Sequence, residues 1–313
     1  MWTIYLPLVP YYILLSIKHR DFGFFARVNP SMHTGGMGLI SKSAMHAMLP
    51  DNSFPSSVLV LPGQAGNIDL FAIRPPYVVK PEYGCRGRGV HFVQTREEVC
   101  SILETFKESM LVQERCTFPL EAGIFCTRKP GQRTVITGIV TKKGIIIVGD
   151  GKRTVLELLQ NSPRYAVHAG YFKKTSIAKT VLTKNESLEI SSIGNHARGA
   201  TFYDESFRIN EQLEAFIDSI TCKIEGFHYG RFDIRFESWE LLEQGKNWKI
   251  IELNGANSEP THIYDPKHSY IFAIREFYRH WHIMSSIIQE LNTTKSRLSL
   301  GELIQMIRKG GMP

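Results

Sequence analysis

Two short segments in the last third of this 313-residue chain carry residue types that bind metal ions and anions. They are residues 230–236 and residues 249–255, and each alternates polar with apolar side chains. Because a strand points successive side chains to opposite faces, the pattern predicts two strands with one polar face each. On the first strand, Arg231, Asp233 and Arg235 share that face, and the apolar residues between them face a core.

The second strand completes a set of oxygen ligands. Glu252 and Asn254 share one of its faces, and Ile251 and Leu253 are expected to point away from them toward the core. The carboxylates of Asp233 and Glu252, with an amide oxygen, suit Mg²⁺, a hard cation that oxygen atoms bind. Arginines beside such ligands would hold anions, above all phosphate. The two strands therefore predict a site for a metal ion and a nucleotide.

A second group of residues, near position 80, predicts contacts to phosphate. Lys80 lies near the end of an expected strand, and a loop over residues 84–89 with three glycines leads into the next strand. Glycines let backbone N–H groups approach phosphate oxygens closely, and the lysine adds a positive charge. The pattern is neither the Walker sequence nor the dinucleotide fingerprint, since both open a helix directly after the loop. A glycine-rich hairpin without a ligand is the alternative.

Composition and charge narrow the class of protein. The chain is 43% hydrophobic and 21% charged, as in ordinary soluble globular proteins, and is long enough for one or two domains. A formal charge of +7 favours anionic partners, but no run of five or six basic residues indicates a nucleic-acid tail. The five cysteines form no CxxC pair, which argues against structural zinc or a disulfide framework and for a reducing cytosol.

The first segment is almost wholly apolar from Trp2 to Ile17 and ends in basic residues. It is shorter than the roughly 20 residues that span a bilayer. Pro7 and Pro10 are expected to break a helix, and the charges follow the apolar run, unlike those of a secretory signal. Three alternatives stay open: an element buried in a core or covered by a partner, an interfacial membrane anchor, and a true span.

The remaining pattern mixes helices and strands without strict alternation, which predicts an α+β fold. Helices are expected over residues 41–49, 96–109, 154–160, 211–223, 268–291 and 298–307. Strands are expected over residues 57–61, 77–81, 90–93, 110–114, 121–127, 134–140 and 144–148, and the last two of these are expected to pair as a hairpin.

Taken in order, these motifs resemble the ATP-grasp superfamily over about residues 42–265. The motifs are a lysine–proline pair with a glycine loop, a strand that ends in Gln113-Glu114, a strand aspartate, and then Glu-x-Asn. Within the family, the chain is similar to D-alanine–D-alanine ligase and other carboxylate–amine ligases, and residues 148–153 resemble a stretch of cyanophycin synthetase-like enzymes. The resemblance implies an ATP-grasp fold, in which two α+β subdomains grip ATP.

The resemblance also implies a role for each matched residue. The residues matched to ATP contacts are Lys42, Lys80, Gly87, Gly89, Gln113, Glu114, Cys116, Glu121 and Arg198. Those matched to Mg²⁺, for which Mn²⁺ could substitute, are Asp233, Glu252 and Asn254. Arg231 would stabilise the oxyanion of a tetrahedral intermediate, with an ordinary salt bridge as the alternative. Arg235 receives no role, and Glu259 permits a cationic amine substrate, with a helix cap or an ordinary loop acid as the alternative.

The implied reaction joins a carboxylate to an amine through an acyl phosphate. Two alternatives remain, namely a phosphotransferase of the same family and a non-catalytic nucleotide-binding module at a membrane. The expected partners are ATP and small-molecule substrates rather than nucleic acid. The expected location is the cytoplasm, at the inner face of the membrane if the first segment docks there. Neither the substrates nor the oligomeric state follow from the sequence.

The chain departs from the family pattern at its N-terminus. Only about forty residues precede Lys42, where most ligases of the family have a whole substrate-binding domain. The resemblance divides the chain into an apolar N-terminal segment (1–37), a subdomain with the glycine loop (38–111), a subdomain with the metal site (112–265) and C-terminal helices (266–313). Either substrate binding has moved elsewhere, or a partner protein, a membrane or the long helix after His268 would supply the missing wall.

Overall fold

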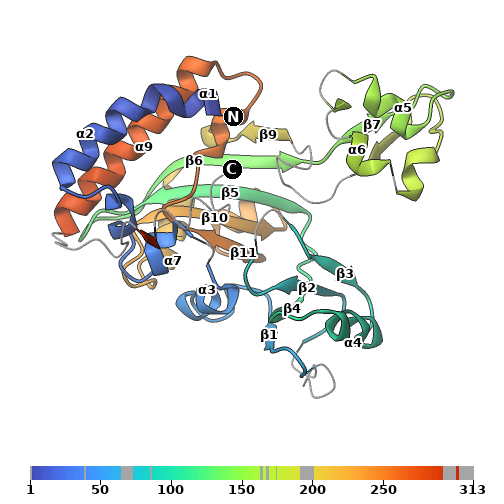
Figure 1. Ribbon diagram of the computed structural model, residues 1–313, viewed down its shortest axis with the longest axis horizontal. Helices are drawn as coiled ribbons and strands as arrows, with labels where there is room; N and C mark the ends of the chain where they lie inside the picture. Colours follow the sequence, from blue (N-terminus) through green and yellow to red (C-terminus); the bar gives the residue numbers. More distant parts are fainter. Residues whose placement is uncertain are drawn as a thin grey trace. The chain divides into compact units, whose positions relative to one another are not determined.

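The computed structural model describes residues 2–38, 40–64, 73–84, 87–162, 165–166, 169–173, 175–190, 201–291 and 301–302. The chain forms two compact units (Figure 1). The first contains residues 1–140, 204–263 and 267–313, and the second contains residues 141–203 and 264–266. Helices and antiparallel sheets occur together in the first unit, so the expected α+β class is confirmed.

A five-stranded sheet, whose strands β11, β10 and β5 belong to the first unit, positions the polar residues of the site. Its strand order is β11 (Trp248–Asn254), β10 (Tyr229–Phe236), β5 (Leu120–Thr127), β6 (Val135–Lys143) and β9 (Thr201–Asp204). The strand β10 pairs antiparallel with both β5 and β11. The strands predicted around positions 233 and 252 are therefore direct neighbours.

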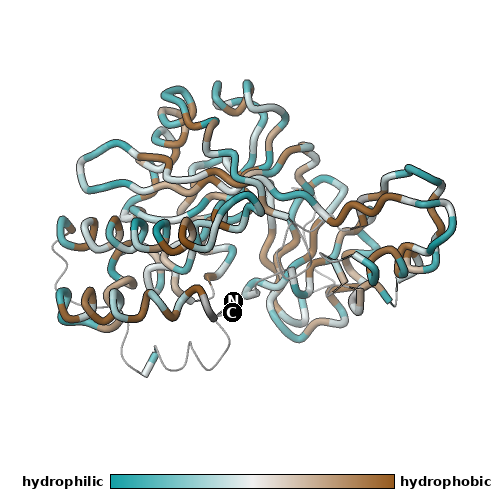
Figure 2. Tube along the Cα trace, turned by 90° about the horizontal axis from the view of Figure 1, so that it is seen from above, coloured by the Kyte–Doolittle hydropathy of each residue, from teal (hydrophilic) through white to brown (hydrophobic). Residues whose placement is uncertain are grey.

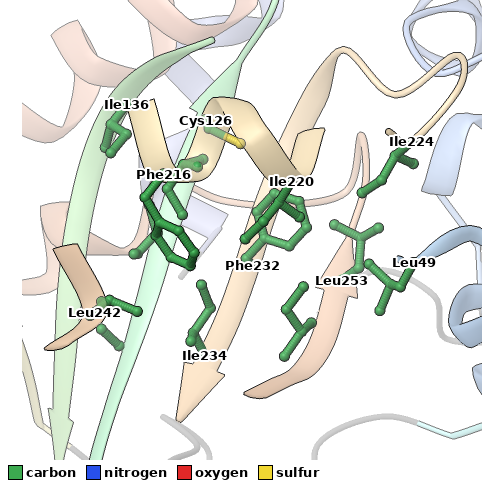
Figure 3. Close-up of a cluster of buried hydrophobic side chains, with 14 of the residues drawn as sticks. Leu49, Cys126, Ile136, Phe216, Ile220, Ile224, Phe232, Ile234, Leu242 and Leu253 are labelled. Atoms are coloured by element: carbon green, nitrogen blue, oxygen red, sulfur yellow. The ribbon is translucent and has the colours of Figure 1, made fainter. Parts of the chain in front are cut away.

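One face of this sheet is covered by α7 (Glu211–Thr221), which is amphipathic and is capped by Asn210, whose side chain accepts from the Leu213 N–H. Figure 3 shows Phe216 and Ile220 of the helix among the same apolar side chains as Phe232 and Ile234 of β10. All four are buried. The apolar face predicted for the strand at 230–236 is the one that packs on this helix.

A β-bulge in the neighbouring strand corrects one part of the sequence pattern. Asp233 pairs with Glu252, but the next pair joins Ile234 to Ile250, so Ile251 is an extra residue on β11. The side chains that face the core are those of Ile250 and Leu253, both fully buried, whereas Ile251 is only half-buried. The expectation that Ile251 points to the core is wrong, because simple alternation does not hold across a bulge.

A second, four-stranded sheet carries the lysine and the glycine loop. Its order is β1 (Ser57–Val60), β4 (Met110–Glu114), β2 (Tyr77–Pro81) and β3 (His91–Val93). The helix α4 (Arg96–Thr105) packs on it and begins with a capping box formed by Thr95 and Glu98. It ends four residues before the expected position 109, because Phe106 already has an extended backbone.

The other short elements complete the first unit. They are α3 (Lys42–Met48), α8 (Trp239–Glu243) and the 3₁₀ turns η2 (Phe24–Arg27), η3 (His33–Gly36), η8 (Ser206–Arg208) and η9 (Thr261–Tyr264). A serine caps α3: the side chain of Ser41 accepts from the Ala44 N–H. The helix contacts β11, and the Met45 side chain lies against the backbone of Leu253.

The second unit has its own small core. It contains β7 (Ile146–Val148) paired with β8 (Ser187–Glu189), and the helical segments α5 (Val155–Gln160), α6 (Ala169–Phe172) and η6 (Ser176–Lys179). The expected hairpin between residues 134–140 and 144–148 is wrong, because β7 pairs with β8 while β6 belongs to the large sheet. Ile145 and Ile147 are buried in the core of this unit, which accounts for the different pairing.

The N-terminal segment is helical and packs along α9 (Tyr270–Leu291). It consists of α1 (Trp2–Tyr5), η1 (Leu6–Leu8) and α2 (Val9–His19). Pro7 and Pro10 do not break these elements, because each stands at the start of one, where no intrahelical N–H donor is needed. The ring of Tyr11 lies 4.6 Å from that of Tyr278. The inner side of the segment is thus a buried element, and no helix in the described ranges is long and apolar enough to cross a membrane.

The side chain of Asn29 ties this N-terminal region to the start of β10. Its Oδ1 accepts from the backbone N–H groups of His228 (2.8 Å) and Tyr229 (2.9 Å). Its Nδ2 donates to the carbonyl oxygens of Gly35 (3.0 Å) and Tyr229 (2.8 Å). The side chain is fully buried, so water could not take over its hydrogen bonds to these backbone groups.

Replacing Asn29 by alanine is expected to lower the free energy of unfolding by about 3 kcal/mol, since several buried backbone groups lose their partner at once. Urea denaturation followed by circular dichroism measures the change. Asn257→Ala, at an exposed position, is the matched control and should change stability by less than about 0.5 kcal/mol. Equal stability of the two variants would contradict the role given to Asn29.

Candidate active site

The structure brings the predicted metal ligands together on two neighbouring strands. Asp233 lies directly opposite Glu252, and Arg231 lies directly opposite Asn254. Opposed residues of an antiparallel pair share a face, with Cβ atoms about 5 Å apart. On the other side of Asp233 stands Gly123 of β5, where an added Cβ would lie 3.0 Å from the Arg231 Cδ and 3.2 Å from the Asp233 Oδ1. A side chain at position 123 would therefore displace this pair.

Arg231 and Asp233 form a largely buried ion pair. The distance from Arg231 Nε to Asp233 Oδ1 is 2.7 Å, and Nη2 lies 3.4 Å from Oδ2. Burial lowers the pKa of Arg231, but the charge and hydrogen bond of Asp233, with the charges of Glu252 and Glu259, outweigh it and raise the pKa. The salt bridge that was the alternative role of Arg231 is thus present. It uses the Nε and Nη2 atoms and does not involve Nη1.

The donor set fits Mg²⁺. Two carboxylates and one amide supply oxygen atoms only, with Glu252 exposed and Asp233 buried. The Nδ2 atom of Asn254 is buried and has no hydrogen-bond partner, so no protein contact fixes this amide through its nitrogen. Within the described ranges, no cluster of three or more His, Cys, Asp or Glu side chains could hold a metal ion. A metal site here depends on the amide as a ligand.

Two lysines, Lys80 and Lys42, lie next to the glycine loop, and their positive charges repel each other. The Nζ of Lys80 donates to Oε1 of Gln113 (2.8 Å), and the Nζ of Lys42 donates to the carbonyl of Pro81 (2.8 Å). Lys80 is only 7% exposed. Burial, reinforced by the charge of Lys42, lowers the pKa of Lys80 to about 8, against the opposing charge of Glu252. A bound anion would offset both the desolvation of the Lys80 ammonium and its repulsion by Lys42.

The electrostatic coupling between Lys80 and Glu252 connects the two groups of predicted residues. They lie on different sheets and far apart in the sequence, yet the charge of Glu252 acts directly on Lys80. The helix α3, which begins at Lys42, contacts β11 as well. The two lysines and the predicted oxygen ligands therefore lie on elements that contact each other.

Glu82 is a residue of this site that the sequence patterns did not indicate. Its Oε1 accepts from the Ser43 hydroxyl (2.6 Å), the Ser43 N–H (3.1 Å) and the Ser41 hydroxyl. Burial raises the pKa of Glu82, but these hydrogen bonds outweigh it and lower the pKa. The carboxylate therefore fastens the start of α3, and with it Lys42, to the end of β2. No local spacing links residues that are about forty positions apart.

The glycine loop is described only in part, because Cys85 and Arg86 lie outside the described residues. Gly87 and Gly89 have φ angles of 68° and 67°, in the left-handed region that favours glycine. A Cβ on Gly89 would also lie 2.8 Å from the ring of Pro81. Glycine is thus required where the loop returns past the lysine–proline pair. Arg198, the other predicted phosphate contact, lies outside the described residues as well.

Residues 112–116, which the sequence resemblance matches to the hinge that pairs with adenine in the family, are held by an arginine that received no role from the sequence. Arg235 Nε lies 3.2 Å from Oε2 of Glu121, and Nη1 donates to the carbonyl of Cys116 (3.1 Å). The backbone N–H of Glu114 donates to the carbonyl of Ser56. Gln113 lies on an inner strand of its sheet, and its side-chain oxygen accepts from the ammonium of Lys80. Arg235 therefore positions Glu121 and the hinge relative to each other.

The segment after β11 meets the N-terminal helix. The hydroxyl of Tyr5 donates to the carboxylate of Glu259, and burial, followed by the Glu259 charge, raises the pKa of Tyr5. His262 lies over Gly138, where an added Cβ would come 2.3 Å from its Nδ1, and His262 contacts Glu276 of α9 (3.1 Å). No sequence spacing relates Tyr5 to Glu259, since 254 positions separate them.

Comparison with known proteins finds likeness at the level of structure. No family model and no curated protein matches the chain. A bifunctional glutathione synthetase from Pasteurella multocida is 16% identical over 76% of this chain and 36% of that chain, with a TM-score of 0.44. VanG D-Ala:D-Ser ligase from Enterococcus faecalis is 12% identical over 84% and 63%, with a TM-score of 0.46. D-alanine–D-alanine ligase from Bacillus anthracis is 13% identical over 83% and 71%, with a TM-score of 0.45.

The likeness concerns the fold alone. The chain spans about a third of the glutathione synthetase and less than two thirds of the VanG ligase. The chemistry of this chain is therefore argued below from its own residues.

Proposed function

We propose that this protein is an ATP-grasp ligase that uses ATP and Mg²⁺ to join a carboxylate to an amine through an acyl phosphate. The observation that carries the proposal is the contact of α3, which begins at Lys42, with β11, which carries Glu252 and Asn254, together with the effect of the Glu252 charge on the buried ammonium of Lys80. This contact supports the proposal because phosphoryl transfer from a nucleotide needs cationic groups for the phosphates beside oxygen ligands for a metal ion.

The residues of the chain would divide the work as follows. Lys80, oriented by Gln113, and Lys42, fastened by Glu82, would hold the phosphates of ATP. Asp233, Glu252 and Asn254 would hold Mg²⁺, which when bound supplies positive charge against the phosphate oxygens.

In the first step, a carboxylate oxygen of the substrate attacks the γ-phosphorus, the bond to the β,γ-bridging oxygen breaks, and ADP leaves. In the second step, the amine nitrogen attacks the acyl carbon, and the tetrahedral oxyanion that forms collapses with loss of inorganic phosphate and a proton. Arg231 is suited to the oxyanion because Asp233 fixes its guanidinium at two nitrogen atoms and Nη1 is outside those contacts. The ion pair thus serves to orient the arginine.

The N-terminal helices would form a wall on the substrate side of the site. Tyr5 of α1 reaches Glu259, which follows the metal strand and whose charge acts on Arg231. A carboxylate in this place would favour a cationic amine as the second substrate.

The proposal is tested by incubating the protein with ATP, Mg²⁺ and pools of carboxylates and amines, while ADP, phosphate and product mass are followed. Ligation requires ADP and free phosphate in equal amounts, formed only when both a carboxylate and an amine are present. A stable phosphorylated acceptor with no free phosphate would overturn the ligase assignment in favour of a phosphotransferase.

Replacing Arg235 by glutamine is expected to weaken ATP binding about tenfold, because Glu121 and the carbonyl of Cys116 lose the group that positions them. Titration with a fluorescent ATP analogue measures the dissociation constant. Arg153→Gln, which removes an exposed arginine paired with Asp150, should leave it unchanged. An unaltered dissociation constant for Arg235→Gln would show that the hinge does not need this arginine.

A further inference from the structure

The outer side of the N-terminal helices is an exposed stripe of apolar side chains. Its members on η1 and α2 recur at intervals of three and four residues, which places them on one side of the helix. They are Leu6 (67% exposed), Val9 (46%), Ile13 (46%) and Ile17 (70%), joined by Leu14 (59%) and by Phe22 (59%) just beyond the helix. We refer to these six residues as the N-terminal apolar face.

The opposite side of the same helix is buried against the rest of the first unit. Leu8 and Leu15 are buried, and Tyr11 and Tyr12 pack with Trp281 of α9. The helix thus carries apolar residues on both sides, and Figure 2 shows apolar (brown) stretches along the trace of the helices at its left. A contiguous apolar patch that no part of the described structure covers is characteristic of a docking surface.

The charges in the helical part of this face are all positive. The first twenty residues contain no aspartate or glutamate, and exposed Lys18 and Arg20 stand at the end of the stripe, where the Lys18 ammonium donates to the hydroxyl of Ser285 on α9 (3.3 Å). Asp21, the first acidic residue, accepts from the Gly23 N–H (2.7 Å) and lies 3.8 Å from Arg27. Its charge is thus directed to its own turn rather than to the apolar face.

We propose that the N-terminal apolar face docks on the surface of a lipid bilayer that contains anionic lipids, with α2 lying in the plane of the interface. The apolar side chains would enter the boundary between headgroups and acyl chains, and Lys18 and Arg20 would contact anionic headgroups. The eleven residues of α2 are about 17 Å long, too short to cross the hydrocarbon core of about 30 Å, so the helix lies on the membrane.

A second copy of this chain fits the face less well. Two copies facing each other through this stripe would bury apolar area, but the segment brings no carboxylate to pair with Lys18 or Arg20 of the other copy. An anionic bilayer provides a partner for both the apolar residues and the cations. The inference is independent of the ligase proposal, because none of the six residues belongs to the candidate active site.

Sedimentation with vesicles tests this inference on the whole protein. Wild-type protein is expected to bind vesicles of phosphatidylcholine with 30% phosphatidylglycerol more tightly than vesicles of phosphatidylcholine alone. Leu14→Glu combined with Ile17→Glu should weaken binding to the mixed vesicles at least tenfold. Val135→Glu, at a residue of β6 that is 52% exposed, is the matched control and should bind like the wild type.

Charge substitutions separate the electrostatic part of the binding. Lys18→Gln and Arg20→Gln should each weaken binding to the mixed vesicles about fivefold and leave binding to neutral vesicles unchanged. Unfolding curves of all variants confirm that they remain folded. Failure of the wild type to bind either vesicle, or undiminished binding by Leu14→Glu/Ile17→Glu, overturns the proposal. So does a wild-type dimer that binds no vesicles and that the double substitution converts to a monomer, since the face would then join two copies.

Discussion

Replacing Asp233 by asparagine is expected to lower the rate of ATP turnover by at least about a thousandfold. The substitution removes one of the two carboxylates of the oxygen-ligand set and the charge that fixes Arg231, at Nε 2.7 Å away. In the proposed mechanism, Asp233 would support both the metal and the oxyanion, and loss of a single oriented charge at a reacting centre already costs about a hundred- to a thousandfold. An assay of ADP release at saturating ATP measures the effect.

Stability has to be separated from catalysis at this position, because Asp233→Asn also leaves a buried guanidinium without its carboxylate. Breaking a buried ion pair of this kind costs about 3 kcal/mol of unfolding free energy. Glu252→Gln provides the comparison, since Glu252 is exposed and its replacement should cost less than about 0.5 kcal/mol. Both variants should lose turnover and should need more Mg²⁺. Full activity of Glu252→Gln would contradict the metal assignment.

The local part of the site could be predicted from the sequence. Alternation along β10 places Arg231, Asp233 and Arg235 on one face, and the register of the strands then sets Asp233 opposite Glu252. Two-residue periodicity is a property of each strand alone, so it can be recognised without knowing the fold. It fails at Ile251, because a bulge depends on how the neighbouring strand pairs.

The supporting contacts could not be predicted, because they join residues that have no regular spacing. Glu82 reaches Ser43, Arg235 reaches Cys116, and Tyr5 reaches Glu259 across 254 positions. The pairing of β7 with β8 could not be predicted for the same reason, since it depends on a small core whose members are spread over the second unit. Single polar residues in such contacts leave no periodic signal.

Replacing Lys80 by methionine is expected to abolish tight ATP binding and, at pH 7, to stabilise the protein without nucleotide. ATP should bind at least about a hundredfold more weakly, since the phosphates lose a buried ammonium. The folded protein, however, pays for burying this charge beside Lys42, as its pKa of about 8 shows. Removing it should raise the free energy of unfolding by about 2 kcal/mol, less the cost of leaving Oε1 of Gln113 without its donor.

The dependence on pH distinguishes this explanation from a simple packing effect. Because the pKa of Lys80 is lowered on folding, from the ordinary 10.5 to about 8, the unfolded chain holds a proton between these values that the folded chain has released. The wild-type free energy of unfolding should therefore gain a contribution that rises with pH from about 8 to 10.5, and the penalty is constant below pH 8. Lys80→Met lacks this contribution, so its advantage should be largest at pH 7 and should shrink as the pH rises.

Urea denaturation at several pH values between 7 and 10 measures this difference. Lys129→Met is the matched control, because Lys129 is 37% exposed in a surface ion pair with Glu290, and its replacement should give a curve parallel to that of the wild type. A Lys80→Met protein that is less stable than the wild type by the same amount at every pH would show that the lysine supports the fold through its contact with Gln113. The expected result instead means that Lys80 lowers the free energy of unfolding as long as no anion is bound. Because its charge is poorly solvated in the protein without nucleotide, it interacts all the more strongly with phosphate.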